Sequence, residues 1–266
     1  MDYTLNCNGR LLSLKEPRVM GILNVTPDSF YADSRKQSEA AIAQRVEQIL
    51  AEGGSIIDVG ACSTRPGSEP VSEADEEERL RSALAVVRRE APDAVVSVDT
   101  FRPDVARMAV EEFGVDIVND VSGATEMFRM VARLRVPYIY MSSKGTMHDV
   151  LLDCAEAVDQ LRSMGQKDII LDPGFGFGKT LEQNYQVMQQ LEQMQMTGLP
   201  VLVGISRKSM IYRLLGTDSE QALNGTTVLN TVALMKDTSI LRVHDVREAM
   251  ECVKLFSHLS PLTPHL

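Results

Sequence analysis

Short runs of aliphatic residues alternate with longer amphipathic stretches along most of the chain. The aliphatic runs contain few polar positions, which is typical of parallel strands that are covered on both faces. The pattern predicts strands at 19–23, 56–60, 95–98, 115–118, 136–141, 169–171, 201–205 and 240–243. Helical periodicity lies between them, at about 38–52, 72–89, 103–113, 147–164, 209–215, 222–236 and 245–258, with a short helix before residue 136 and another from about residue 180.

Eight strand–helix pairs of this size close most economically into an α/β fold, the (β/α)8 TIM barrel. We expect a single domain over residues 1–266, and an open doubly wound sheet is the alternative architecture. Residues 3–14 alternate in polarity around Asn8-Gly9, the strongest two-residue hairpin signal, so a short N-terminal β-hairpin should cap the bottom of the barrel. No Gly-x-Gly-x-x-Gly follows the first strand, which leaves a Rossmann dinucleotide site unsupported.

Composition narrows the classes of function. The 266 residues are 44% hydrophobic, enough for a large core, and the net charge of −10 argues against a nucleic-acid or membrane partner. The four cysteines are scattered and no apolar N-terminal run resembles a signal peptide, so we expect a reducing, cytoplasmic location. The four histidines form no helical pair that would favour zinc.

The most informative stretch is residues 169–180, where a buried strand ends in an acid and a glycine-rich loop follows. Pro173 biases Asp172 toward an extended backbone, and the glycines after it let a ligand approach the main chain closely. Gly178-Lys179-Thr180 resembles the end of a phosphate-binding P-loop, but that motif needs glycine where Pro173 stands. The stretch therefore predicts a carboxylate at a strand end and no P-loop.

Polar residues follow nearly every predicted strand. In a barrel the carboxyl ends of all strands share one face, where active sites lie, so these residues should converge: Asn24, Thr64, Asp99, Asn119, Asp172, Lys208, Arg242 and His244. The acids and the amide in the set suit a flat heterocycle that carries N–H donors. The last two loops are basic, with Arg207, Lys208, Arg242 and His244, and barrel loops in this position commonly hold phosphate. We expect a heterocycle deep in the barrel and a phosphate or diphosphate near its rim.

These residues lie in segments that resemble the dihydropteroate synthase family, the sulfonamide target of folate biosynthesis. The matching segments occur in the family's order and span most of the chain: 20–30, 56–60, 63–67, 97–100, 118–121, 172–179, 206–209 and 242–246. The resemblance implies condensation of 6-hydroxymethyl-7,8-dihydropterin diphosphate with 4-aminobenzoate to 7,8-dihydropteroate and pyrophosphate. It also implies a homodimer and Mg²⁺ as cofactor.

The resemblance carries residue roles with it. By similarity, the pterin is bound by Asp99, Asn119, Met141, Asp172 and Lys208, of which Asp99, Asp172 and Lys208 are catalytic. The diphosphate is bound by Thr64, Arg65, Arg242 and His244, and Asn24 helps to bind the metal. The aminobenzoate is bordered by Thr64, Pro66, Phe177, Ser206 and Lys208.

One segment departs from the family. Residues 141–147 read Met-Ser-Ser-Lys-Gly-Thr-Met, where many members carry Met-His-Met-x-Gly, and the connection onward to Asp172 is short. Two alternative functions stay open: a methyltetrahydrofolate-binding methyltransferase domain with a corrinoid partner, and a non-catalytic pterin-binding homologue.

Overall fold

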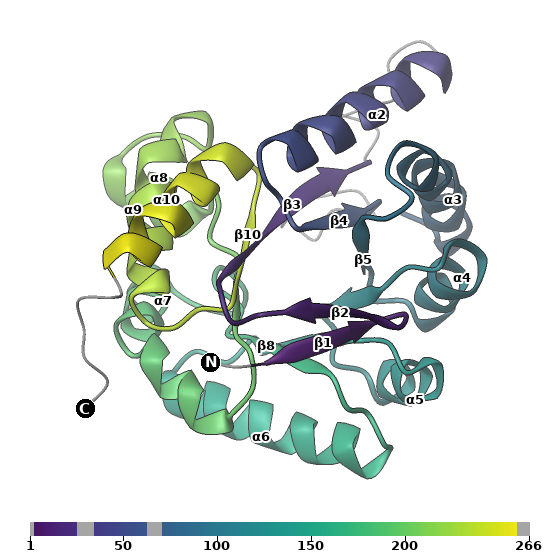
Figure 1. Cartoon of the computed structure of the whole chain (residues 1–266). Helices are drawn as coiled ribbons and strands as arrows, with labels where there is room; N and C mark the ends of the chain where they lie inside the picture. Colours follow the sequence, from purple (N-terminus) through teal and green to yellow (C-terminus); the bar gives the residue numbers. More distant parts are fainter. Residues whose placement is uncertain (1–2, 26–34, 63–70, 260–266) are drawn as a thin grey trace.

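In the computed structural model the chain forms a barrel of parallel strands surrounded by helices (Figure 1). The structure describes residues 3–25, 35–62 and 71–259. The strands of the barrel are β3 (Arg18–Asn24), β4 (Ile56–Gly60), β5 (Val95–Asp99), β6 (Ile117–Asp120), β7 (Tyr138–Met141), β8 (Ile169–Asp172), β9 (Leu202–Val203) and β10 (Ile240–Val243).

The strands pair in parallel in the order β8-β7-β6-β5-β4-β3-β10-β9, so sequence neighbours are also neighbours in space. A parallel bridge between Leu171 and Val201 joins the two ends of this order and closes the barrel. The predicted (β/α)8 architecture is confirmed. The seventh strand, β9, is shorter than the predicted 201–205. The segment before it still pairs, because the carbonyl of Pro200 accepts the Leu171 N–H at 2.9 Å.

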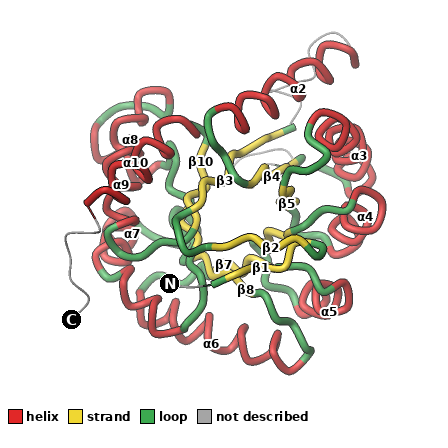
Figure 2. The backbone as a smooth tube through the Cα atoms, viewed as in Figure 1, coloured by secondary structure: helices red, strands yellow, loops and turns green. Residues whose placement is uncertain are grey.

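Helices form a ring around the strands (Figure 2). They are α2 (Arg35–Ala51), α3 (Glu73–Glu90), α4 (Pro103–Phe113), α5 (Thr125–Leu134), α6 (Met147–Ser163), α7 (Leu181–Gln189), α8 (Ser209–Leu215), α9 (Leu223–Leu234) and α10 (Val246–Leu259), with 3-10 turns η1 (Leu191–Thr197) and η2 (Glu220–Ala222). Side chains that accept backbone N–H groups set three helix starts: Ser72 at α3, Thr146 at α6 and Thr180 at α7. Within the described residues no helix has both the length and the apolar character needed to cross a membrane.

The predicted hairpin is present as β1 (Thr4–Cys7) and β2 (Arg10–Ser13), which pair antiparallel through a turn with positive φ at Asn8 and Gly9. It lies across the end of the barrel where the strands begin (Figure 1). Leu5, Cys7 and Leu14 are buried there against inward residues of the barrel, including Met20 and Ile170. The hairpin therefore closes this end of the barrel with apolar side chains.

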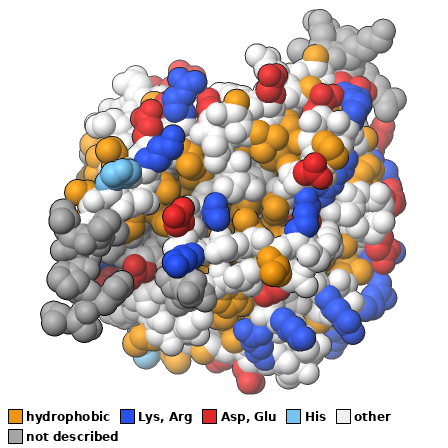
Figure 3. Space-filling view, in the orientation of Figure 1, with side chains coloured by type: hydrophobic (Ala, Val, Ile, Leu, Met, Phe, Trp, Pro, Cys, Tyr) orange, Lys and Arg blue, Asp and Glu red, His pale blue; other side chains and the backbone are white. Residues whose placement is uncertain are grey.

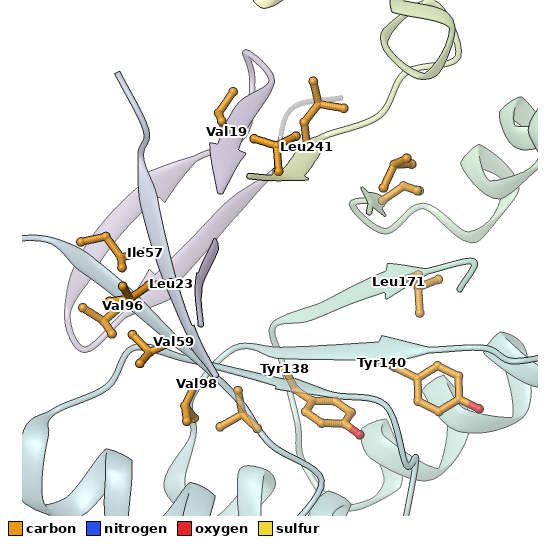
Figure 4. Packing of buried hydrophobic residues seen from close by; sticks show 14 of the residues in the cluster. Val19, Leu23, Ile57, Val59, Val96, Val98, Tyr138, Tyr140, Leu171 and Leu241 are labelled. Carbon is orange, nitrogen blue, oxygen red and sulfur yellow. The ribbon is translucent and has the colours of Figure 1, made fainter. Parts of the chain in front are cut away.

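A second and larger core fills the space between strands and helices. Val19, Ile57, Val98 and Leu171 belong to it and point outward from the barrel (Figure 4). Alternate residues of the same strands point inward, because successive side chains of a strand face opposite sides. The polar residues Asn24, Asp99, Asn119, Asp172 and Arg242 can therefore share the interior, while their aliphatic neighbours pack against the helices.

Charged side chains of both signs are spread over the helices on the hairpin side of the molecule (Figure 3). Buried acids at this end have structural partners. Asp116 is fully buried, and its carboxylate lies 3.0 Å from the Arg10 guanidinium and 3.1 Å from that of Arg88. It also accepts the Val96 N–H at 2.9 Å. This network ties the hairpin to the strands, so the chemistry of the predicted site must be sought at the opposite end.

Candidate active site

The carboxyl ends of the strands bring several predicted site residues into one network. Arg242 on β10 reaches across the barrel, and its Nη2 lies 2.5 Å from the Asp99 carboxylate at the end of β5. Its Nε lies 2.6 Å from a second carboxylate, that of Asp58 on β4. Asn119 on β6 donates to the same Asp58 oxygen at 3.1 Å. Four strands thus meet through hydrogen bonds inside the barrel.

Asn24, at the end of β3, borders this network. A methyl group placed at Gly60 would lie 3.6 Å from the Asn24 Oδ1 and 3.6 Å from the Asp99 Oδ2, the oxygen that also accepts from Arg242 Nη2. Oxygen ligands of this kind suit Mg²⁺, which usually takes one or two protein groups and completes its shell with water and phosphate. Among the described residues no three His, Cys, Asp or Glu side chains cluster as a metal site. The amide oxygen of Asn24 thus fits a metal that arrives with a phosphate ligand better than a closed structural ion.

Burial changes the proton affinities of the two predicted acids. It raises the pKa of Asp99 to about 7, although the Arg242 guanidinium opposes the shift. Burial also raises the pKa of Asp172, against the opposing effects of Lys208 and of the Gly174 N–H, which donates to Asp172 Oδ1 at 2.7 Å. Carboxyl groups that are largely withdrawn from water favour ligands that bring their own donors or positive charge.

Lys208 follows β9 and faces the loop after β8. Its ammonium group donates to the Phe175 carbonyl and lies 4.7 Å from the centre of the Phe177 ring. Burial lowers the pKa of Lys208 to about 8, and the nearby Asp172 opposes this shift. A lysine of this kind holds its proton less firmly than an exposed one, so it can donate to a ligand atom and take the proton back.

Ser206 and His244 form a pair next to Lys208. The Ser206 hydroxyl and the His244 Nδ1 are 3.0 Å apart, and the His244 N–H donates to the same hydroxyl at 3.1 Å. Arg207, between Ser206 and Lys208 in sequence, is held elsewhere: its guanidinium contacts Asp245 at 2.8 Å and 2.9 Å and also binds loop carbonyls. Of the four basic residues in the last two loops, Arg207 thus has a structural role.

The glycine-rich loop after β8 is shaped by close contacts with the loop after β7. Gly174 has a φ of +69°, and a Cβ there would lie 2.1 Å from the Ser142 carbonyl oxygen, so only glycine fits. Met141, the last residue of β7, is buried and lies against the same glycine. The Ser142 N–H donates to the Asp172 carbonyl at 2.9 Å. The segment that departs from the family is therefore docked directly on the strand that carries Asp172.

Lys179 completes this junction. Its ammonium group donates to three carbonyls, those of Gly174 at 3.0 Å, Ser142 at 3.2 Å and Phe177 at 3.3 Å. It neither resembles a P-loop lysine nor lies free in solvent. Burial lowers its pKa to about 8. Lys179 thus fastens the two loops that border Asp172.

Sequence reasoning missed Asp58. This side chain is fully buried on β4 and binds both Arg242 and Asn119. A signal was present: Asp58 stands inside an aliphatic strand, two positions before Gly60, and so faces the same side as the strand end. The predicted residues Thr64, Arg65 and Pro66 lie outside the described part of the chain.

Comparisons with known proteins agree with this geometry. Residues 20–244 match the family model of the pterin binding enzymes. The chain is 40% identical over 250 residues to a dihydropteroate synthase of Clostridium beijerinckii, covering 89% of this chain and 92% of that protein. It is 35% identical over 269 residues to the dihydropteroate synthase of Haemophilus influenzae, covering 95% and 97%.

Solved structures show the same likeness. The 7,8-dihydropteroate synthase of Vibrio fischeri superposes with a TM-score of 0.89 at 35% identity, covering 98% of this chain and all of that one. The Xanthomonas albilineans enzyme with 4-aminobenzoic acid gives 0.89 at 34% identity, covering 99% and 100%. The Yersinia pestis enzyme in complex with a sulfonamide drug gives 0.87 at 33% identity, covering 97% and 100%.

Proposed function

Because the chain belongs to the pterin-binding enzyme family, and within it to the dihydropteroate synthases, we propose that it makes 7,8-dihydropteroate. The substrates are 6-hydroxymethyl-7,8-dihydropterin diphosphate and 4-aminobenzoate, and pyrophosphate is released. The observation that carries this proposal is the convergence of Asp99, Asn119, Asp172, Lys208 and Arg242 at one end of the barrel. The proposal is also supported by the relatives that are 35% and 40% identical to this chain, which are dihydropteroate synthases.

The pterin would lie deep in the barrel, among groups that match its donors and acceptors. Asp172 would accept from the amino and ring N–H groups, and Asn119 and Asp99 would bind the other edge. Met141, buried at the end of β7, would pack against the ring. Lys208 would donate to a ring acceptor, which its lowered pKa of about 8 makes reversible.

Chemistry starts at the bond between the methylene carbon and the diphosphate oxygen. That bond breaks, its electron pair leaves with pyrophosphate, and a cation stays on the pterin methylene group. Asp99 and Asp172 are fixed before the reaction, so they stabilise the cation without reorganising. The arylamine nitrogen then forms the new C–N bond with its lone pair, and the resulting ammonium group loses one proton to water. No nucleophilic side chain is needed.

The leaving group would be held at the rim. Arg242 and His244, with Thr64 and Arg65, are proposed to bind the diphosphate, and Asn24 the metal. When bound, Mg²⁺ neutralises charge that develops on the pyrophosphate. The fit rests on the amide oxygen of Asn24, which lies beside Gly60 at the carboxyl end of β3. Phe177, Ser206, Lys208, Thr64 and Pro66 are proposed to border the aminobenzoate.

We also propose a homodimer in the cytoplasm. Large hydrophobic side chains are exposed on α8, α9 and α10, which pack side by side (Figure 1). They are Leu214 and Leu215 of α8, Val228 of α9, Met235 directly after α9, and Leu255 and Leu259 of α10. Several large apolar side chains exposed on adjoining helices are typical of an interface between subunits. Sulfonamides are proposed to compete with 4-aminobenzoate, as the complex of the Yersinia pestis relative suggests.

The test combines the purified chain with the pterin diphosphate, 4-aminobenzoate and Mg²⁺, and follows pyrophosphate. We expect release that depends on all three, with dihydropteroate as the second product. Pterin binding without pyrophosphate release would instead support the non-catalytic homologue. Transfer of a methyl group from methyltetrahydrofolate to a corrinoid would support the methyltransferase.

A further inference from the structure

The two carboxylate oxygens of the buried Asp58 side chain differ in their hydrogen bonding. One oxygen, Oδ2, accepts both from Arg242 Nε at 2.6 Å and from Asn119 Nδ2 at 3.1 Å. The other oxygen, Oδ1, has no hydrogen-bond donor among the described residues. A buried carboxylate that is only half satisfied costs stability. Asp58 therefore lowers the free energy of unfolding relative to a carboxylate with both oxygens bonded.

Asp116 shows what a structural acid looks like in the same barrel. It is also fully buried and also paired with arginine, but both of its oxygens have partners: Oδ1 meets Arg10 at 3.0 Å, and Oδ2 meets Arg88 at 3.1 Å and the Val96 N–H at 2.9 Å. It lies at the hairpin end, away from the candidate active site. The contrast separates an acid that secures the fold from one that faces the site.

The contacts of Asp58 act on Arg242 at a defined point. The guanidinium is held by two nitrogens, Nε by Asp58 and Nη2 by Asp99 at 2.5 Å, from two neighbouring strands. Because the group is planar, two such contacts fix both its position and its plane. A single contact would leave it free to rotate about the remaining bond.

Asp58 also acts on Asn119. The amide donates through Nδ2 to Asp58, which turns its Oδ1 away from the carboxylate. One side chain on β4 thus sets the orientation of two groups on β6 and β10. A ligand generally binds more tightly when long side chains, and amides that can adopt two flipped orientations, are already oriented before it binds.

We propose that Asp58 is a positioning residue for the pterin diphosphate, which fixes the Arg242 guanidinium on the diphosphate side and the Asn119 amide on the pterin side before the ligand enters. It touches neither reacting atom. The proposal rests on the proposed synthase function, because the ligand it serves is the pterin diphosphate.

The test measures KM separately for the two substrates in Asp58→Asn. This change keeps the shape of the side chain and removes its charge. We expect the KM for the pterin diphosphate to rise about tenfold, while the KM for 4-aminobenzoate stays within about twofold. The matched control is Asp116→Asn, which should lower the unfolding midpoint and leave both KM values within about twofold. Equal changes in both KM values, or none, in Asp58→Asn would overturn the proposal.

A double-mutant cycle shows whether Asp58 acts through Arg242. Adding Asp58→Asn to Arg242→Met should raise the KM for the pterin diphosphate by less than about twofold, because the group to be positioned is gone. A full tenfold effect in that background would contradict the proposed route.

A spectroscopic measurement serves if Asp58→Asn does not fold. In the wild-type chain labelled with ¹⁵N-arginine, the Arg242 Nε–H, assigned by its loss in Arg242→Lys, should exchange slowly without ligand. Rapid exchange would overturn the proposal. If the wild-type chain releases no pyrophosphate, the proposed synthase function is wrong. The positioning role can still be tested by comparing the Kd of 6-hydroxymethyl-7,8-dihydropterin for the wild type and for Asp58→Asn.

Discussion

Gly174→Ala is the sharpest test of how the loop after β8 is built. Alanine at a positive φ costs about 1–2 kcal/mol anywhere in a chain. At Gly174, with φ +69°, the new Cβ would also lie 2.1 Å from the Ser142 carbonyl oxygen. The loops must then separate, which threatens the Lys179 bond to Ser142 at 3.2 Å and the Gly174 bond to Asp172 at 2.7 Å.

The magnitude follows from these parts. Losing a buried hydrogen bond costs about 1–3 kcal/mol, so we expect Gly174→Ala to lower the free energy of unfolding by about 4 kcal/mol in total. Gly198→Ala is the matched control, because Gly198 has a φ of +66° and no atom within 4 Å of the new Cβ. It should lose only about 1 kcal/mol.

Thermal and urea unfolding measure the difference. For a chain of this length, at about 2 °C per kcal/mol, we expect Tm to fall by about 8 °C in Gly174→Ala and by about 2 °C in Gly198→Ala. Gly174→Ala should also weaken pterin binding, because Asp172 loses the N–H that orients its carboxylate. Equal losses of stability in the two variants would refute the argument that the contact with Ser142, and not the backbone angle, makes Gly174 necessary.

Four further predictions follow from the site. Lys208→Met should reduce pyrophosphate release at least about 100-fold and leave the urea midpoint unchanged or higher, since a buried lysine costs stability; unchanged turnover would contradict its role. Phe177→Leu should raise the KM for 4-aminobenzoate about fivefold without changing that for the pterin, and the opposite pattern would move Phe177 to the other ligand. Lys179 has its pKa lowered to about 8 from an ordinary 10.5, so the unfolded chain binds more protons between these values; the stability of the wild type relative to Lys179→Met should therefore rise as pH increases through this window, and a constant difference in urea titrations would contradict the burial of its charge. Chelation of divalent ions should stop pyrophosphate release, which Mg²⁺ restores, without a change in Tm; a large fall in Tm would indicate a structural ion instead.

The fold could be predicted from the sequence because a (β/α)8 barrel requires a regular alternation of aliphatic runs and amphipathic stretches. Parallel strands covered on both faces give aliphatic runs, and Asn8-Gly9 marked the hairpin directly. The seventh strand was overestimated, since periodicity marks where a strand is apolar and not where its hydrogen bonds end. Element boundaries depend on such tertiary pairing.

Only the site residues that lie at or after the ends of strands could be predicted from the sequence. Asp99, Asn119, Asp172 and Lys208 stand at those ends, and the barrel brings them together. Asp58 stands inside a strand, so it was read as part of an aliphatic run. Arg242 was assigned to the rim with the other cations, but the structure pairs it with two acids in the interior. The sequence excluded a P-loop at Lys179 but gave no sign of its partners, which are three loop carbonyls. Such pairings join residues far apart in the chain, and no local pattern encodes them.

The hairpin has a consequence for how a ligand can reach the barrel. Leu5, Cys7 and Leu14 pack on inward side chains of the strands, including Met20 and Ile170, so the half of the interior near the hairpin is filled with apolar side chains. A ligand that contacts Asp99 or Asp172 must therefore approach from the carboxyl ends of the strands. The hairpin thus helps to give the barrel one accessible face, although it contributes no residue to the candidate active site.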